Sequence, residues 1–258
     1  MTALVTGAAM RLGRAMALEL ARQGHDVAIH YAGSAKAAEE TATEIRALGR
    51  TAVTLQADLT VEDEMQALVP RAAEALGQPL TVLINNASIF EHDTIRTATR
   101  DSWDRHLESN LRAPFVLTQA FAAQVPQAET DENGEPQAQG LVVNMIDQRV
   151  LKLTPEFMSY TIAKMGLWAF TRTAAQALAP HVRVNAIGPG PTLQGARQSD
   201  THFARQRAAT VLGRGADSDG ICDALRYFLN ARAVTGQLIC VDGGQHLAWQ
   251  TPDVLGVE

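Results

Sequence analysis

Three residues in the second half of the sequence combine types and spacing suited to proton transfer. Tyr160 and Lys164 stand four positions apart, so a helix would project both from one face. A nearby ammonium favours the phenolate, and we therefore expect Lys164 to lower the pKa of Tyr160 toward neutral pH. Such a tyrosine can act as a general acid that passes a proton to a substrate as hydride arrives.

Asp147 follows the apolar run LVVNMI (141–146), which predicts a buried strand with the carboxylate at its carboxyl end. Burial in a cleft would raise the pKa of Asp147 and let it share a proton with Tyr160. A carboxylate beside a carbonyl repels the charge of a developing alkoxide, whereas the nitrogen of a ring C=N must gain a proton. Asp147 therefore favours a C=N substrate. The alternative is a structural aspartate that caps a loop amide.

A turn that suits a nucleotide opens the sequence. TGAAMRLG (6–13) follows the first apolar run and begins a helical pattern, with Gly7 and Gly13 six positions apart and Leu12 between them. Small residues let the backbone approach a pyrophosphate, and the helix start supplies amide donors. An ordinary tight turn is the alternative interpretation.

The second strand indicates which dinucleotide is bound. NAD sites carry an acidic residue there for the ribose 2′-hydroxyl, but this chain has Tyr31, Ala32, Gly33 and Ser34. Arg11 in the glycine turn together with a hydroxyl suits a 2′-phosphate, so we infer NADPH. Alternatively, Arg11 is only a surface charge.

Asp58 and its neighbour Leu59 end the third strand and are candidates for contacts with the adenine. Asp58 could accept a hydrogen bond from the adenine amino group. It could equally cap the helix that follows.

These residues need a scaffold in which strands alternate with helices. Strand-like and helix-like runs follow one another at 3–6, 12–23, 26–31, 35–48, 51–58, 61–76, 81–87, 103–125, 141–146, 159–179, 182–190 and 237–244. The alternation predicts an α/β fold with a doubly wound parallel sheet of about seven strands and helices on both faces. We expect one domain over 1–258, an exposed loop at 127–139 and a substrate loop at about 191–215.

Composition excludes several other classes. The 258 residues carry a formal net charge of −6, which argues against a nucleic-acid partner. No run approaches the length of a membrane span, and we expect no signal peptide, because no basic or long apolar segment precedes the first strand. Neither the two cysteines nor the seven histidines have metal-ligand spacing. We expect a cytoplasmic protein with a small-molecule substrate, no metal and no membrane partner.

Together these motifs resemble the short-chain dehydrogenase/reductase family from end to end. The resemblance rests on TGAAMRLG (6–13), NNAS (85–88), Ser109-Asn110, Tyr160-x-x-x-Lys164, Pro189-Gly190 and VDGG (241–244). It implies a single-domain Rossmann-type NADP-dependent oxidoreductase that forms a homotetramer. HYAGSA (30–35), NNASIF (85–90), NMID (144–147) and GPGPT (188–192) are similar to the pteridine reductases, which reduce pterins and folates with NADPH and carry Asp where most of the family has Ser.

The resemblance also assigns roles to single residues. It implies that Lys164 holds the nicotinamide ribose and that Asn110 kinks its helix and helps hold a proton-relay water. Phe90 would stack on a flat pterin, although a plain core position is the alternative. The remaining implied cofactor contacts are Asn86, Ala87, Ser88, Pro189, Gly190 and Thr192.

Two other functions stay open at this point. A carbonyl reductase for keto or oxoacyl compounds would use Asp147 in place of Ser. A non-catalytic NADPH-binding sensor would share the fold, although the complete set of Tyr160, Lys164 and Asn110 favours an enzyme.

Overall fold

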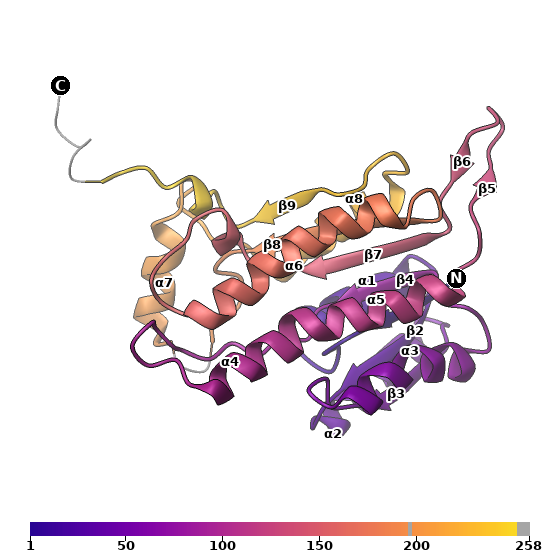
Figure 1. Cartoon of the computed structure of the whole chain (residues 1–258), viewed down its shortest axis with the longest axis horizontal. Coiled ribbons are helices and arrows are strands. Elements are labelled where there is room, and N and C mark those ends of the chain that lie inside the picture. Colours follow the sequence, from indigo (N-terminus) through magenta and orange to yellow (C-terminus); the bar gives the residue numbers. More distant parts are fainter. Residues whose placement is uncertain (196–197, 252–258) are drawn as a thin grey trace.

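The computed structural model, which describes residues 1–195 and 198–251, is built around one parallel sheet. Figure 1 shows this sheet with long helices packed along it. Its strand order is β3-β2-β1-β4-β7-β8-β9, and every neighbouring pair is parallel. The strands are β1 (Thr2–Val5), β2 (Asp26–Tyr31), β3 (Ala52–Gln56), β4 (Val82–Asn85), β7 (Gly140–Met145), β8 (Val182–Pro189) and β9 (Leu238–Val241). The predicted Rossmann-type fold and the number of strands are confirmed.

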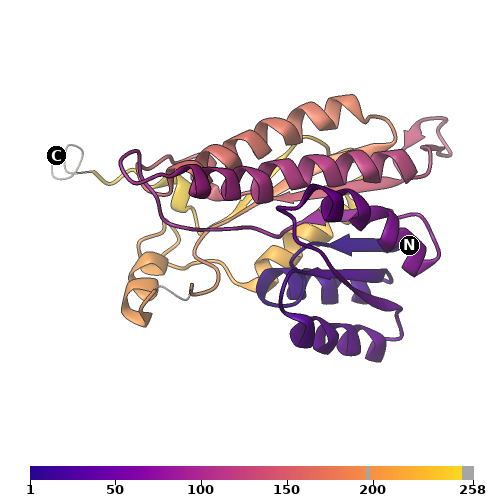
Figure 2. The ribbon, with the colours of Figure 1, turned by 60° about the horizontal axis from the view of Figure 1, so that its bottom comes forward.

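Helices cover both faces of the sheet. The α-helices are α1 (Arg11–Arg22), α2 (Ala35–Ala47), α3 (Glu62–Leu76), α4 (Arg100–Leu107), α5 (Ala113–Gln124), α6 (Met158–Ala177), α7 (Asp200–Ala208) and α8 (Ser218–Asn230). Short helical turns are η1 (Glu108–Arg112), η2 (Gln148–Val150) and η3 (Gln245–Leu247). In Figure 2, α5 and α6 run alongside each other on one face of the sheet. Among the described residues, no helix is both long and apolar enough to cross a membrane.

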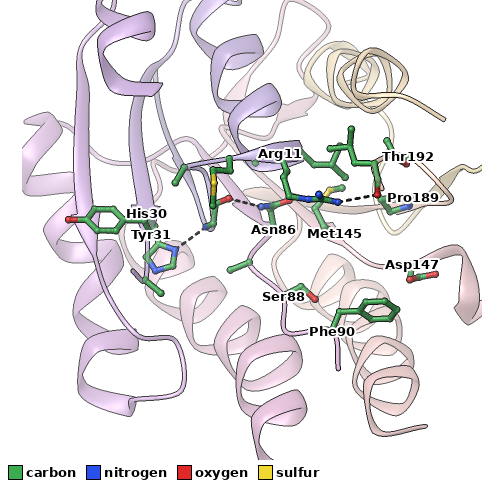
Figure 3. A pocket seen from close by; sticks show the side chains of 18 of the residues that line it. Arg11, His30, Tyr31, Asn86, Ser88, Phe90, Met145, Asp147, Pro189 and Thr192 are labelled. Carbon is green, nitrogen blue, oxygen red and sulfur yellow. Dashed lines mark hydrogen bonds between the residues drawn. The ribbon is translucent and has the colours of Figure 1, made fainter. Parts of the chain in front are cut away.

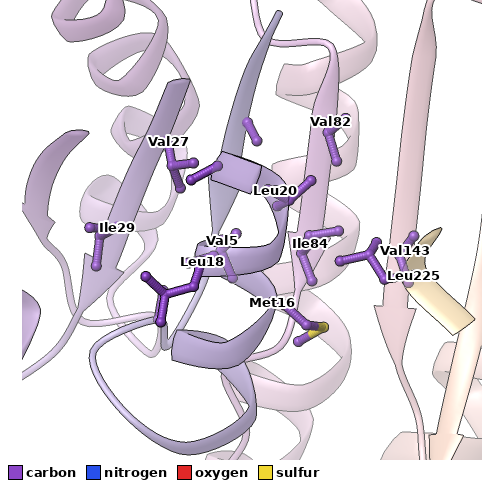
Figure 4. Packing of buried hydrophobic residues seen from close by; sticks show 14 of the residues in the cluster. Val5, Met16, Leu18, Leu20, Val27, Ile29, Val82, Ile84, Val143 and Leu225 are labelled. Atoms are coloured by element: carbon purple, nitrogen blue, oxygen red, sulfur yellow. The ribbon is translucent and has the colours of Figure 1, made fainter. Parts of the chain in front are cut away.

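The core consists of two apolar layers, one on each face of the sheet. Successive side chains of a strand point to opposite faces of the sheet and so belong to different layers. Val5 packs with α1, α2 and α8, whereas its neighbour Leu4 packs with α3, α5 and α6. Val5 lies opposite Ile29 of β2 and Ile84 of β4 in the ladder. Figure 4 shows Met16 of α1 and Leu225 of α8 over this strand face. Burial of both strand faces fixes the register and therefore the position of every strand end.

Three segments differ from the sequence predictions. The helix expected at 103–125 is divided into α4, the π-helix η1 and α5, and it begins at Arg100 because Thr99 and Ser102 form a capping box. The loop expected at 127–139 contains a small antiparallel hairpin, β5 (Glu129–Thr130) with β6 (Pro136–Gln137), which projects from the body in Figure 1. Helix α8 was not foreseen.

The segment expected to be the substrate loop, about 191–215, contains α7. Its residues 196 and 197 lie outside the described part of the chain. The substrate loop and the domain limits of 1–258 stay predictions.

Candidate active site

A pocket of about 540 Å³ opens at the carboxyl ends of β1, β2, β4, β7 and β8. This is the edge at which doubly wound sheets bind ligands. In Figure 3, Tyr31 lies at one end of the pocket, and Phe90 and Asp147 lie at the other. The residues predicted from sequence that line it are Gly7, Arg11, Leu12, Gly13, Tyr31, Ser34, Asn86, Ala87, Ser88, Phe90, Asp147, Tyr160, Lys164, Pro189, Gly190 and Thr192.

The turn after β1 is held so tightly that only glycine fits at two positions. Gly7 has φ +62°, and a Cβ on Gly13 would lie 2.2 Å from the Gly7 carbonyl oxygen. The Asn86 side chain donates to the Thr6 carbonyl at 2.8 Å. His30 Nδ1 accepts from the Gly7 amide at 3.0 Å. His30, which the sequence analysis did not single out, therefore fixes the turn from the neighbouring strand.

The pocket suits a dinucleotide with several negative charges. In the part of the chain described, no side chain caps the start of α1, so its first amides and the positive dipole end face the pocket edge. Ser34 precedes α2, and its hydroxyl does not cap that helix. Among the described residues that line the pocket, Asp147 is the one carboxylate. The residues therefore fit a phosphate-rich cofactor at the end near Tyr31.

Arg11 lines the pocket, and its side chain bonds the segment that follows β8. It has φ +56°, and its guanidinium donates to the carbonyl oxygens of Gln194 at 2.9 Å and Leu193 at 3.1 Å. Figure 3 shows its side chain extending toward Pro189 and away from Tyr31. In this arrangement Arg11 ties the first turn to the segment after β8, and its contact with a 2′-phosphate stays a prediction.

Three predicted site residues lie outside the pocket walls. Asp58 Oδ1 accepts from the Thr60 amide at 2.9 Å and from its hydroxyl at 2.7 Å, and these bonds lower the pKa of Asp58. These bonds lie in the turn before α3, whose N-cap is Val61 and has no side-chain cap, so Asp58 does not cap that helix as the alternative had it. Leu59 is buried in the layer that packs on α3.

The third residue, Asn110, lies in η1 and is completely buried. Its side chain bonds both main-chain groups of Ile89, accepting from the amide at 2.9 Å and donating to the carbonyl at 2.8 Å. The π-helix η1 separates α4 from α5 at this residue, where the resemblance implied a kink. Asn110 thereby anchors the segment that carries Ser88 and Phe90.

Asp147 and Tyr160 form a hydrogen-bonded pair at the other end of the pocket. The Tyr160 hydroxyl donates to Asp147 Oδ2 at 3.0 Å. The second oxygen, Oδ1, accepts from the Arg149 amide at 2.8 Å and caps η2. Asp147 thus has the structural role considered for it, because one oxygen caps the loop amide, while the other oxygen faces the phenol and its catalytic role stays a prediction.

The prediction that Lys164 lowers the pKa of Tyr160 is wrong. Burial and then the charge of Asp147 raise the pKa of Tyr160 well above its usual value. Lys164 donates to the Met145 carbonyl at 2.8 Å, and burial lowers its own pKa to about 8. Burial also raises the pKa of Asp147, as predicted. The pair therefore retains a proton, and Tyr160 is a proton holder rather than a phenolate.

Phe90 forms a wall of the pocket and is not a core residue, since 44% of its surface is exposed. Its ring stacks on Phe157 with centroids 4.3 Å apart and meets the edge of Tyr160 at 4.7 Å. Phe157 was not singled out from the sequence because it belongs to a loop without a motif. Pocket residues that were likewise not singled out are Ala9, Met10, His30, Met145, Ile146 and Leu193.

Comparisons with known proteins agree with this geometry. The sequence profile of the family described as short chain dehydrogenase matches residues 1–204. The FolM alternative dihydrofolate reductase 1 of Brucella suis, solved in complex with NADP, is 44% identical, with a TM-score of 0.90 over 98% of each chain. A short-chain dehydrogenase of Burkholderia cenocepacia in complex with NADP is 31% identical, with a TM-score of 0.85 over 94% of this chain and 96% of that one. The 3-oxoacyl-(acyl-carrier-protein) reductase FabG of Staphylococcus aureus is 30% identical over 95% of this chain and 98% of that protein.

Proposed function

Because this chain belongs to the short-chain dehydrogenase/reductase family of oxidoreductases, we propose that it is an NADPH-dependent reductase of a pterin or folate-like C=N bond. The observation that carries the proposal is the Tyr160 hydroxyl bonded to Asp147 Oδ2 at 3.0 Å. Reduction of a ring C=N requires a proton at nitrogen as well as a hydride at carbon. An acid pair at the pocket wall that retains its proton suits that requirement.

The comparisons support the same substrate class and cofactor. The FolM alternative dihydrofolate reductase is 44% identical over nearly the whole chain, and its structure was solved with NADP. The absence of a carboxylate between Tyr31 and Ser34 agrees with a cofactor that carries a 2′-phosphate. The turn at Gly7 and the start of α1 would hold the pyrophosphate, and Ser34 with the start of α2 would hold the 2′-phosphate.

NADPH supplies the hydride when bound, and the side chains of this chain manage the proton. Tyr160 donates its hydroxyl proton toward the substrate nitrogen, and Asp147 returns a proton to the phenol oxygen. Asp147 lines the pocket and is partly exposed, so its carboxylate can take up a proton from water in the pocket. Lys164 donates to the Met145 carbonyl and would hold the nicotinamide ribose, as the family resemblance implies.

Phe90, which lines the pocket and stacks on Phe157 behind it, favours a flat substrate. Two rings stacked with an interplanar angle of 9° present an aromatic edge and face beside Tyr160. Aromatic stacking adds roughly 0.5–1.5 kcal/mol to the burial of a planar ring. A pterin matches this shape better than a flexible aliphatic ketone.

A second candidate, reduction of a 3-oxoacyl compound, has one observation in its favour. The FabG relative is 30% identical over 95% of the chain, and the Tyr160–Lys164 pair suits a carbonyl as well. Asp147 argues against this candidate, because its charge would oppose the negative charge that develops on a carbonyl oxygen.

We also propose a homotetramer, as the family resemblance implies. Large apolar side chains on α5 and α6 support a helix-to-helix interface, since Phe115, Ile162 and Met165 are each at least 38% exposed. Light scattering after size exclusion would test the assembly. A cytoplasmic location stays a prediction from the sequence.

The test of function is the initial rate of NADPH oxidation with a dihydropterin, beside a panel of small ketones and keto-esters. We expect turnover of the pterin with the ketones nearly inert, and a loss of roughly 10²–10⁴-fold in Tyr160→Phe. Turnover of ketones alone would reject the pterin and keep the reductase. Equal affinity for NADPH and NADH would reject the argument for a 2′-phosphate.

A further inference from the structure

Helix α6, which carries Tyr160 and Lys164, is capped by a residue from a distant part of the sequence. Phe157, at its N-cap, has φ +58° and makes no side-chain cap. The carbonyl oxygen of Asp93 accepts from the amides of Phe157 at 2.8 Å and Met158 at 3.3 Å. Asp93 Oδ1 accepts from the Ser159 amide at 3.1 Å. Asp93 therefore satisfies the first amides of the helix and places a negative charge at its positive end.

The other oxygen of Asp93 ends a chain of hydrogen bonds with a single possible direction. The Glu91 amide donates to His106 Nε2 at 3.1 Å, His106 Nδ1 lies 2.7 Å from the Ser159 hydroxyl, and Ser159 donates to Asp93 Oδ2. An amide can only donate and an ionised carboxylate can only accept. His106 must therefore be neutral with its proton on Nδ1.

The pKa shifts of Asp93 and His106 agree with an ionised carboxylate and a neutral imidazole. Burial alone would raise the pKa of Asp93, but hydrogen bonds from Ser159 and Ser102 outweigh it and hold the pKa below its usual value. Burial lowers the pKa of His106. Asp93, His106 and Ser159 are each at most 5% exposed, and none of the three lines the pocket. Although hydrolases use the same residue types, here serine lies between the other two and meets no substrate.

These buried hydrogen bonds connect the segment that carries Phe90 with the helix that carries Tyr160, on two sides of the pocket. Phe90, three positions before Asp93, stacks on Phe157, which directly precedes the capped helix. Tyr160 follows Ser159 and touches Phe90 edge-on at 4.7 Å. A displacement of Asp93 would therefore move the aromatic wall relative to the Tyr160 hydroxyl.

We propose that Asp93, Ser159 and His106 form a positioning unit that fixes the Tyr160 hydroxyl relative to the Phe90 wall. The proposal rests on the proposed reductase function, because Tyr160 is the group that it positions. The three residues act through Tyr160 and contact neither substrate nor cofactor. Exchange of Asp93 for Asn leaves an acceptor for the Ser159 amide but turns a donor toward the Ser159 hydroxyl. Ser159 must then donate to His106 Nδ1, which moves the proton of His106 to Nε2. That proton would face the Glu91 amide, so two donors would meet there without an acceptor.

The experiment compares Asp93→Asn and Ser159→Ala, alone and combined, with Asp101→Asn as control. Asp101 is an exposed aspartate in the first turn of α4. With whichever substrate the wild type reduces, we expect each single variant to lose about tenfold or more in kcat, with the Kd of NADPH within about twofold. The combined variant should lose no more kcat than the less active single variant, because both substitutions break the same series of hydrogen bonds. Additive losses, or a lowered melting temperature with kcat unchanged, would overturn the unit.

A second readout needs no turnover. Ultraviolet titration of the phenol, with Tyr160→Phe as baseline, should show that Asp93→Asn brings the pKa of Tyr160 down toward that of an exposed tyrosine. An unchanged titration in both Asp93→Asn and Ser159→Ala would overturn the unit. If Asp93→Asn does not fold, Ser159→Ala alone decides by the same criteria. A wild type that reduces neither pterins nor ketones would refute the proposed function, while the titration would still decide the positioning unit.

Discussion

Replacing Asp147 by Asn separates the charge of this residue from its role in the loop. An amide oxygen can still accept from the Arg149 amide, which Asp147 Oδ1 accepts at 2.8 Å. The negative charge next to the phenol disappears. We therefore expect the pocket to remain intact while the pKa of Tyr160 falls, because the charge of Asp147 is the second largest cause of its rise after burial.

The separation of the two oxygens sets the size of this effect. At 3.0 Å, the charges of carboxylate and phenolate repel by about 1 kcal/mol with the dielectric constant of water and by about 5 kcal/mol with an effective value near 20. The lower figure alone corresponds to a fall of about one unit in the pKa of Tyr160. The chain has three tyrosines, so titration by ultraviolet absorbance with Tyr160→Phe as baseline can isolate this phenol.

The two substrate classes should respond in opposite directions. Asn cannot share a proton with Tyr160, so pterin reduction should fall by roughly 10²–10⁴-fold. A more acidic Tyr160 without a neighbouring negative charge should leave reduction of an activated ketone unchanged or faster. Equal losses with both substrates would refute the special role of Asp147. A phenol pKa that does not fall would refute the electrostatic argument itself.

Further predictions concern Lys164, His25 and Arg11. Burial lowers the pKa of Lys164 to about 8, so kcat/KM should decline as pH rises through about 8, and the residual activity of Lys164→Arg should lack this decline. Burial lowers the pKa of His25 to about 4. Between about pH 6.5 and 4 the unfolded chain binds a proton at His25 and the folded chain does not. The free energy of unfolding, measured with urea, should therefore decrease as the pH is lowered through this window. At pH 4.5 the decrease should be about 2–3 kcal/mol larger than in His25→Leu. Arg11→Ala should weaken NADPH binding about tenfold in fluorescence titration, because it releases the segment after β8. Arg14→Ala, in the same helix with an exposed ion pair, should bind NADPH as the wild type does.

Periodicity and strand ends predicted the scaffold well, because burial on both faces leaves a clear signal. Apolar runs such as LVVNMI correspond to β7, and the residues that follow them do line the pocket. Helix α8 was missed although Ile221, Leu225 and Phe228 follow helical spacing after the cap at Asp217. The signal was present there, since the segment has both a cap and an amphipathic pattern. Periodicity alone gave no sign of the division of the helix at η1, and only the family resemblance implied an interruption there, as a kink at Asn110.

The state of the reacting proton depends on distances that spacing in the sequence does not give. The interval between Tyr160 and Lys164 predicts a shared helix face, but the ammonium is directed to the Met145 carbonyl while the carboxylate of Asp147 reaches the phenol. Likewise, Asp93 and Ser159 are 66 positions apart and belong to no common motif. The Tyr-x-x-x-Lys motif therefore predicts which hydroxyl is the candidate proton donor. Whether that hydroxyl holds its proton depends on the strand-end residue beside it, and the same residue argues for nitrogen rather than oxygen as the proton acceptor.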